Sequence, residues 1–240
     1  MKDTGSADIA AKLESLARDM GTTHFGIADL APARQSISEQ GGEFLTQFPR
    51  AISHGFTLTD AIVNTLVYHK SVPALHTYGH YVYQTVNPRL DSISLTLAQA
   101  LGKAGFQAYV VPASQTVDRT RLVGVFSHKL AAHLAGLGWI GKSALLVTRE
   151  QGPRVRWGTV LTDAPLEAGT PMDEICGDCS VCVKACPAHA FTGQVFDQPR
   201  PRSAIFAAEA CDRYLSERET FYRVCGMCVY VCPFGRTKRT

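Results

Sequence analysis

The chain has 240 residues, of which 45% are hydrophobic and 19% are charged, and its formal net charge is +3. This composition is ordinary for a globular protein. The length allows one large domain or two modest ones. No apolar run approaches the roughly 18 residues needed to span a bilayer, so we expect no membrane association. The only dense basic stretch is GRTKRT (235–240), which argues against a nucleic-acid partner. The N-terminal MKDTGSADIA lacks an export signal, which favours a cytoplasmic protein.

Helical and extended patterns alternate over the first 170 residues. The stretch SADIAAKLESLARDMG (6–21) predicts an amphipathic helix, and NPRLDSISLTLAQALGKAG (87–105) predicts a second one with Leu90, Ile93, Leu97 and Leu101 on one face. A shorter helix is expected within SHKLAAHLAG (127–136). Strands are expected within THFGIADL, RAISHGF, FQAYVVPA, ALLVT and RWGTVLTD. This alternation predicts an α/β or α+β domain over residues 1–170, followed by a ferredoxin-like module over residues 171–240.

The stretch GLGWIGKS (136–143) matches the phosphate-binding pattern G-x-x-x-x-G-K-[ST]. That motif requires a strand before it and a helix after it, whereas here a helix is expected before it and a strand after it. We therefore expect no nucleotide site. Two alternatives remain: a turn that packs Trp139 into the core, or a place where the backbone closely approaches a large planar cofactor.

All eight cysteines lie between Cys176 and Cys232. The first group is CGDCSVCVKACP (176–187), the second is CGMCVYVCP (225–233), and Cys211 stands between them. Tyr222 occupies the position in the second group that Cys176 occupies in the first, so Cys211 is the remaining cysteine that can complete the second set. In two-cluster ferredoxins the last cysteine of such a run ligates the other cluster. The spacing therefore predicts two 4Fe–4S clusters, one on Cys176, Cys179, Cys182 and Cys232, and one on Cys186, Cys211, Cys225 and Cys228.

Eight cysteines could instead form zinc sites or four disulfides. Zinc sites typically pair C-x2-C units that are far apart in the chain, unlike these runs. Four disulfides would be unusual in a cytoplasmic protein. The cysteine pattern therefore favours iron–sulfur clusters over both.

The stretch AAHLAGLGWIGKSALLVTREQGPRVRWGTVLTD, followed by the two cysteine groups, resembles the epoxyqueuosine reductases and, more distantly, the reductive dehalogenases. This resemblance implies a nitroreductase-like domain that binds cobalamin and receives electrons from the two clusters. It also implies a short version of the family, without the C-terminal helical-repeat domain. Corrinoid reduction, or corrinoid-dependent reduction of a small substrate, is the implied activity, with a low-potential electron donor protein as partner.

If cobalamin binds, the resemblance implies that the corrin is contacted by residues near the glycine-rich turn, namely Ser127, Gly138, Trp139, Gly141 and Lys142. The family carries an acidic proton donor shortly before that turn, but the matching LVGVFSHK (122–129) has no carboxylate, and Asp118 is the nearest one upstream. His128 and Tyr81 are therefore the proton-donor candidates, since each can donate near neutral or mildly alkaline pH. Both residues also have an ordinary structural interpretation, His128 on a helix face and Tyr81 in an aromatic cluster with Tyr78 and Tyr83.

Two rival functions remain open. The chain could be an electron-transfer protein that binds no corrinoid, or a flavin-dependent reductase with FMN in the same fold.

Overall fold

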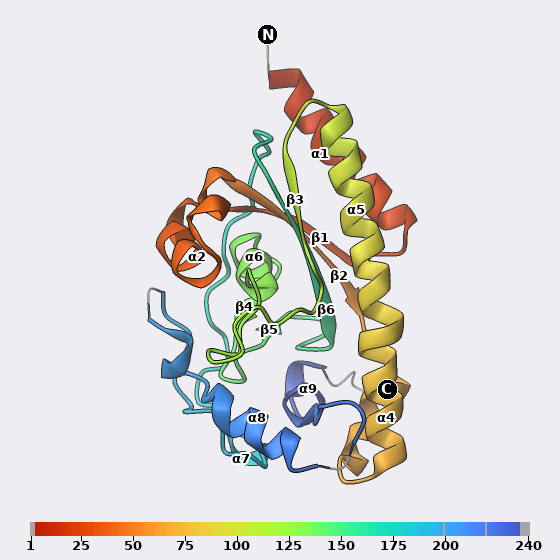
Figure 1. Ribbon diagram of the computed structural model, residues 1–240, viewed down its shortest axis with the longest axis vertical. Helices are drawn as coiled ribbons and strands as arrows, with labels where there is room; N and C mark the ends of the chain where they lie inside the picture. The colour runs from red at the N-terminus through yellow and green to blue at the C-terminus, as the bar shows by residue number, and fades with distance from the viewer. Residues whose placement is uncertain (1–2, 199, 219, 236–240) are drawn as a thin grey trace. The chain divides into compact units, whose positions relative to one another are not determined.

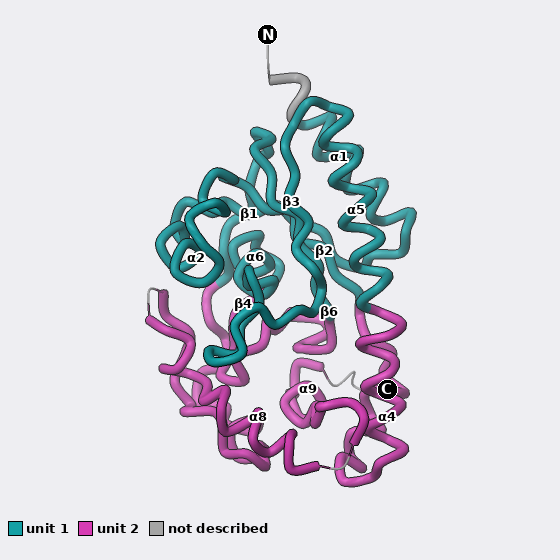
Figure 2. Tube along the Cα trace, viewed as in Figure 1, with its two compact units in different colours: residues 1–56, 87–137, 156–172 teal, residues 57–86, 138–155, 173–240 magenta. Residues whose placement is uncertain are grey.

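The computed structural model describes residues 3–198, 200–218 and 220–235. The basic segment at residues 235–240 falls outside this description except for its first glycine. The chain divides into two compact units, coloured in Figure 2: residues 1–56, 87–137 and 156–172 form the first, and residues 57–86, 138–155 and 173–240 the second. These units do not follow a single boundary near residue 171, and the predicted division into two domains stays a prediction.

The first unit is built on a four-stranded sheet with the strand order β1-β2-β6-β3. Its strands and the helices on them are, in chain order, α1 (Asp3–Asp19), β1 (His24–Asp29), α2 (Arg34–Gly41), β2 (Arg50–Thr57), α5 (Asn87–Lys103), β3 (Ala108–Val111), α6 (His128–Leu134) and β6 (Val155–Thr162). Strand β1 pairs antiparallel with β2, with Ile27 opposite Ile52, and β3 pairs antiparallel with β6. The arrangement is α/β, as the sequence predicts (Figure 1).

Helices α1 and α5 pack on one face of this sheet. All four residues of the predicted apolar stripe on α5 are fully buried. Three of them, Ile93, Leu97 and Leu101, lie in one core with Leu13 of α1 and with Ile27 and Ile52 of the sheet. Gly26, the residue that precedes Ile27 on β1, faces the opposite side of the sheet. A Cβ added there would lie 3.1 Å from the side chain of Leu137, which follows α6. Alternation along the strand therefore separates the α1–α5 layer from the α6 layer.

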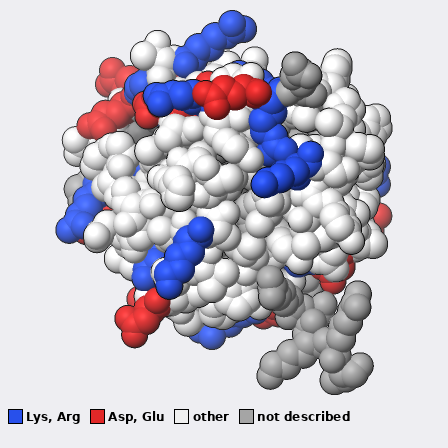
Figure 3. Space-filling view, turned by 90° about the horizontal axis from the view of Figure 1, so that it is seen from below, with Lys and Arg blue, Asp and Glu red and all other residues white. Residues whose placement is uncertain are grey.

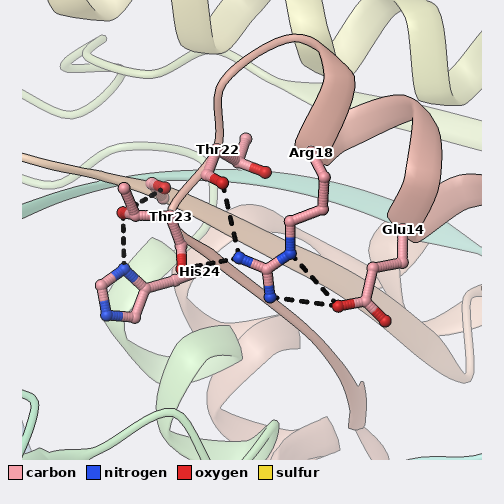
Figure 4. A network of polar contacts seen from close by, with 6 residues as sticks. Glu14, Arg18, Thr22, Thr23 and His24 are labelled. Atoms are coloured by element: carbon pink, nitrogen blue, oxygen red, sulfur yellow. Dashed lines mark hydrogen bonds and ion pairs between the residues drawn. The ribbon is translucent and has the colours of Figure 1, made fainter.

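Polar contacts fix the connection between α1 and β1 (Figure 4). Arg18 in the last turn of α1 donates to the Glu14 carboxylate at 3.0 Å and to the Thr23 carbonyl oxygen at 2.7 Å. The Thr23 hydroxyl lies 2.8 Å from His24 Nδ1 at the start of β1. The Arg18 guanidinium thereby pairs with a carbonyl oxygen of the connection, and a cation in the last turn is also favoured by the helix dipole.

The second unit consists of short helices and a two-stranded hairpin. Its elements are α3 (Asp60–Asn64), η3 (Thr65–Tyr68), α4 (Val72–His80), a π-helical turn η4 (Tyr81–Val86), β4 (Trp139–Ile140), β5 (Leu146–Val147), α7 (Val181–Ala185), η5 (Arg202–Ala204), α8 (Ala208–Ser216), α9 (Met227–Tyr230) and η6 (Pro233–Gly235). Strands β4 and β5 pair antiparallel around the glycine-rich turn, with Trp139 opposite Val147. Buried Arg154 is hydrogen-bonded to Asp60 at 2.5 Å and to Asn64 at 3.0 Å, which ties residues 138–155 to α3. Among the described residues, no helix is long and apolar enough to cross a membrane.

Candidate metal centre

The eight cysteines all belong to the second unit. Cys182 lies on α7, Cys211 on α8 and Cys228 on α9, while the other five lie in the turns beside these helices. All eight are free thiols, so the disulfide alternative is not observed. The short helices therefore carry a set of thiols available for metal.

The electrostatic contacts among these thiols separate the first predicted group. Burial raises the pKa of Cys182, and negative charge on Cys176 and Cys179 raises it further. Burial likewise raises the pKa of Cys232 to about 11, and Cys176 and Cys182 add to that rise. Cys232 lies 50 or more residues away in the chain from the other three cysteines, and it thus interacts with the first motif rather than with its own.

The second group is identified in the same way. Burial raises the pKa of Cys211 to about 11, with Cys186 and Cys225 adding to the rise. The pKa of Cys228 is raised by burial first and then by Cys225, Cys211 and Cys186, with Cys182 of the other group contributing least. Cys211 on α8 therefore lies among the thiols of the second motif, as required for it to be the missing ligand. The ligand assignment itself stays a prediction, and this pattern of contacts supports it.

The chemistry of the donor set favours clusters. In the described ranges, no group of three Cys, His, Asp or Glu side chains is placed to hold one metal ion. The donor set is also entirely thiolate, which is the usual set for 4Fe–4S clusters.

The glycine-rich turn lies beside this thiol set. Trp139 is buried and its indole nitrogen lies 3.4 Å from Cys176 Sγ, and Lys142 Nζ donates to the Gly177 carbonyl oxygen. A Cβ added at Gly138 would lie 2.3 Å from the Val147 carbonyl oxygen. Trp139, Lys142 and Gly138 thus contact the chain's own atoms, and the role of these residues as corrin contacts stays a prediction. The turn also joins two strands rather than a strand and a helix, so it is not a phosphate-binding loop.

Another predicted corrin contact, Ser127, belongs to the first unit. It precedes α6 and lines a cavity of about 30 Å³. A second cavity of this unit, of about 260 Å³, lies beside Arg34 and Phe48. Pockets for drug-sized ligands are typically about 300–1,000 Å³, and cobalamin is larger than such ligands. Neither cavity fits it.

His128 is partly buried in the first unit, and both ring nitrogens are engaged. Nδ1 lies 2.8 Å from the Thr159 hydroxyl and Nε2 lies 2.9 Å from the Pro112 carbonyl oxygen. Since a carbonyl only accepts, Nε2 carries the proton and Nδ1 accepts from Thr159. Burial lowers the pKa of His128 to about 4. This environment keeps the imidazole neutral and occupied, and it gives no support to the role of proton donor.

The other proton-donor candidate, Tyr81, and the nearest upstream carboxylate, Asp118, are also held by local contacts. The Tyr81 hydroxyl accepts from the Thr59 backbone N–H at 3.1 Å and lies 3.0 Å from the Thr59 hydroxyl. It begins the π-helical turn, a feature frequent at functional sites. Exposed Asp118 accepts hydrogen bonds from the backbone and side chain of Arg121, and these hold its pKa below the usual range. A carboxyl in that state is ionised at neutral pH and has no proton to give.

One residue of the second motif has a role that spacing alone does not reveal. Tyr222, which stands where a cysteine would be expected, stacks on Tyr83 with ring centroids 6.3 Å apart and lies 3.2 Å from His80 Nδ1 through its hydroxyl. A Cβ at Gly79 would lie 2.4 Å from the Tyr222 side chain. The tyrosine therefore joins α4 and η4 to the second cysteine motif. The small residue Gly79 in an otherwise bulky helix was the available sequence indication of this close contact.

Comparison with known proteins agrees with this site. Residues 175–235 match the family described as "4Fe-4S double cluster binding domain". The epoxyqueuosine reductase of Synechococcus sp. (strain CC9605) is 32% identical over 167 residues, which cover 68% of this chain and 49% of that protein. The chain spans a third to a half of the length of the curated relatives it matches. The resemblance seen in the sequence is thereby confirmed.

Solved structures share the fold. An epoxyqueuosine reductase bound to an epoxyqueuosine-modified tRNA stem loop matches with a TM-score of 0.60 and 18% identity, over 96% of this chain and 66% of that one. A reductive dehalogenase, whose structure is described as suggesting a mechanism for B12-dependent dehalogenation, matches with a TM-score of 0.68 and 18% identity, over 94% of this chain and 31% of that one. At this identity the match establishes the architecture.

Proposed function

We propose that this protein is an iron–sulfur oxidoreductase that carries two 4Fe–4S clusters and delivers electrons one at a time to a cobalamin. The proposal is carried by eight free thiols within a segment that matches a double-cluster family. Among them, Cys232 interacts with Cys176 and Cys182, and Cys211 interacts with Cys186 and Cys225. Each cluster would be held by three cysteines of one motif and one cysteine from elsewhere. This exchange of ligands ties residues 176–186 to residues 211–232.

Burial of the thiols suits them to hold clusters. Their raised pKa values reflect the cost of placing several thiolates together in a poorly solvated space. Iron removes that cost, because its positive charge stabilises the thiolates when their protons leave. We therefore expect the second unit to be stabilised by loading, and cluster assembly to release protons.

The acceptor that we propose is supported by the relatives rather than by a cavity in this chain. A reductive dehalogenase of the same fold is described as B12-dependent, and the nitroreductase-like character of the first unit is part of the same proposal. When bound, cobalamin supplies a strongly reducing low-valent cobalt. We assign it no residue, since Trp139, Lys142 and Gly138 contact the chain's own atoms.

The substrate that we propose is a modified nucleoside of tRNA. The sequence argued against a nucleic-acid partner, and that expectation conflicts with the tRNA stem loop bound by a protein of the same fold. On the face drawn in Figure 3, lysine and arginine side chains are dispersed among uncharged and acidic ones. Binding of one small stem loop needs few phosphate contacts and does not require the dense stripe of a duplex-binding module.

The test is anaerobic reconstitution. The full chain is loaded with iron and sulfide, mixed with excess hydroxocobalamin and desalted, and its iron, absorbance and EPR are recorded. We expect about eight irons per chain and retained base-off cob(II)alamin. The loaded protein is then reduced and incubated with an epoxyqueuosine-containing stem loop, whose deoxygenation is followed by mass spectrometry.

The outcomes separate the alternatives. About eight irons without retained corrinoid would leave an electron-transfer protein, or a flavin enzyme if yellow colour persists after the clusters are removed by acid. Retained cobalamin with an unchanged stem loop would leave a corrinoid reductase acting on a small molecule. Absence of bound iron would overturn the proposal at its base.

A further inference from the structure

The sulfur of Cys176 is surrounded by the glycine-rich turn rather than by solvent alone. The indole N–H of Trp139 points at it from 3.4 Å. A Cβ added at Gly141 would lie 3.2 Å from the same sulfur, so the absence of a side chain there is what lets the backbone approach. Burial raises the pKa of the Cys176 thiol, whereas hydrogen bonds from the Trp139 indole and the Lys142 backbone lower it. The indole N–H of Trp139 and the backbone of the turn thus both approach one thiol.

The hairpin holds these donors in position. Gly141 N–H donates to the Leu145 carbonyl oxygen at 2.9 Å, and Ala144 N–H donates to the Gly141 carbonyl oxygen at 2.8 Å. Ala144 adopts φ 55°, a left-handed conformation that a non-glycine residue takes at an energetic cost. These hydrogen bonds and the left-handed residue therefore fix the conformation of the turn on both sides of Lys142.

The Trp139 side chain is held as firmly as the turn that carries it. It is 1% exposed, and its ring meets Phe234 edge to face, with centroids 4.9 Å apart. Phe234 follows Cys232 by two residues, so one indole contacts chain next to two ligands of the first cluster. A ring held in this way keeps its N–H aimed at the sulfur instead of rotating it to water.

The cysteine loop is anchored from the same side. Lys142 Nζ donates to the Gly177 carbonyl oxygen, and the Cys176 backbone N–H donates to the Glu174 carboxylate at 2.6 Å. Cys179 N–H donates to the Cys176 carbonyl oxygen at 2.9 Å. The loop is thereby held against the turn by its backbone as well as by its sulfur.

We propose that residues 138–142 form a hydrogen-bonding cradle for the Cys176 thiolate, and that the Trp139 N–H raises the reduction potential of the cluster this thiolate ligates. The proposal rests on the cluster ligands proposed above and assigns Trp139 as a positioning residue. N–H donors to a ligand sulfur draw electron density from it. They stabilise the reduced, more negative cluster more than the oxidised one. The glycines then serve a close approach to sulfur rather than to phosphate or corrin.

A purely structural Trp139 would fill space and leave the potential unchanged. The substitution Trp139→Phe keeps an aromatic ring in the hairpin and removes the N–H. Trp157→Phe is the matched control, because Trp157 is the second of two tryptophans, is buried on β6, and its indole nitrogen has no hydrogen-bond partner among the described residues. The same atoms are removed in both variants, and only one removal affects a cluster ligand.

The measurement is an EPR-monitored anaerobic redox titration of the three reconstituted full-length proteins. We expect Trp139→Phe to lower the reduced-to-oxidised ratio of one cluster about tenfold at fixed potential, a shift of about 59 mV to more negative values for a one-electron couple. The other cluster and the Trp157→Phe protein should match wild type. Equal midpoints in all three proteins would overturn the proposal.

A second measurement decides the case in which Trp139→Phe fails to hold its cluster. In Trp157→Phe protein grown with 15N-indole tryptophan, Trp139 is the sole labelled residue. Hyperfine (HYSCORE) spectra of the reduced protein should show a 15N coupling to one cluster, and absence of that coupling would overturn the proposal. Wild-type protein that binds no iron would instead refute the proposed function, so the two failures are distinguishable.

Discussion

Acidification should destabilise the first unit through two histidines that the proposed chemistry does not use, the buried His54 and the partly buried His128. Burial, assisted by the charge of His128, lowers the pKa of His54 to about 3, and burial lowers the pKa of His128 to about 4. His54 Nε2 lies 2.8 Å from the Ser94 hydroxyl between β2 and α5. Both imidazoles are therefore neutral in the folded chain down to pH values at which the unfolded chain is charged.

The sign and size of the change in folding stability with pH follow from proton linkage. As pH falls below 6.5, the unfolded chain binds protons that the folded chain excludes, so stability is lost as pH falls from about 6.5 towards 4. For a histidine with these two pKa values, the loss at pH 5 is about 2 kcal/mol. The two histidines together predict a loss of about 4 kcal/mol between pH 7 and pH 5, a large part of the stability of an ordinary domain.

The assay uses the tryptophans of the two units. In a Trp139→Phe background, Trp157 on β6 is the only tryptophan and reports on the first unit. Urea unfolding is followed by its fluorescence at pH 7, 6 and 5. The control His128→Gln keeps a donor and an acceptor at that position without a titrating group. It should lose about half as much stability as its parent over this range.

An equal loss in parent and His128→Gln proteins would refute the reasoning for His128. A loss below about 1 kcal/mol in the parent would refute it for both histidines, because it would mean that water or structural relaxation accommodates the charges.

Three further predictions test the clusters and the packing. Cys211→Ala should reduce reconstituted iron from about eight to about four per chain, measured by iron assay, and an unchanged content would remove this residue from the second ligand set. Gly79→Ala should destabilise the second unit by about 1–3 kcal/mol, because its Cβ would fall 2.4 Å from a packed side chain, whereas Gly102→Ala in α5, with open space around it, should be neutral or stabilising in the same thermal melts. Leu97→Ala should cost about 2–5 kcal/mol in urea unfolding and half-exposed Leu95→Ala about 0.5 kcal/mol or less, and similar losses would contradict the core assignment.

The parts of this structure that the sequence predicts are those set by local pattern. The apolar stripe of α5 falls on fully buried positions because a 3.6-residue period admits one inward face. The strands of the main sheet match the predicted segments to within one residue at each end that exceeds them, since β-branched runs bounded by turns have few other uses. The cysteine groups are equally local, because three thiols at two-residue gaps have little use other than a cluster.

The environment of a single side chain is not encoded in this way. His128 lies on a short predicted helix, but its partners come from Pro112 and from Thr159 on β6, 16 and 31 residues away. A histidine on a helix face gives no indication of whether a carbonyl and a hydroxyl will be brought to its two nitrogens. The role of proton donor that we expected for His128 stays a prediction, and in this packing both of its ring nitrogens have partners.

The glycine-rich turn is a second place where the sequence does not specify the contact partner. Glycines followed by lysine predict a backbone that offers N–H groups at close range to an anion, and phosphate, a corrin side chain and a thiolate all satisfy that description. Sequence specifies the donors, but the acceptor is decided by which segment the fold brings to the turn, here Cys176, 37 residues from Trp139. A match to a phosphate-binding pattern is therefore evidence for a donor-rich turn before it is evidence for a nucleotide. In this chain, the acceptor that the structure places there is a cysteine sulfur.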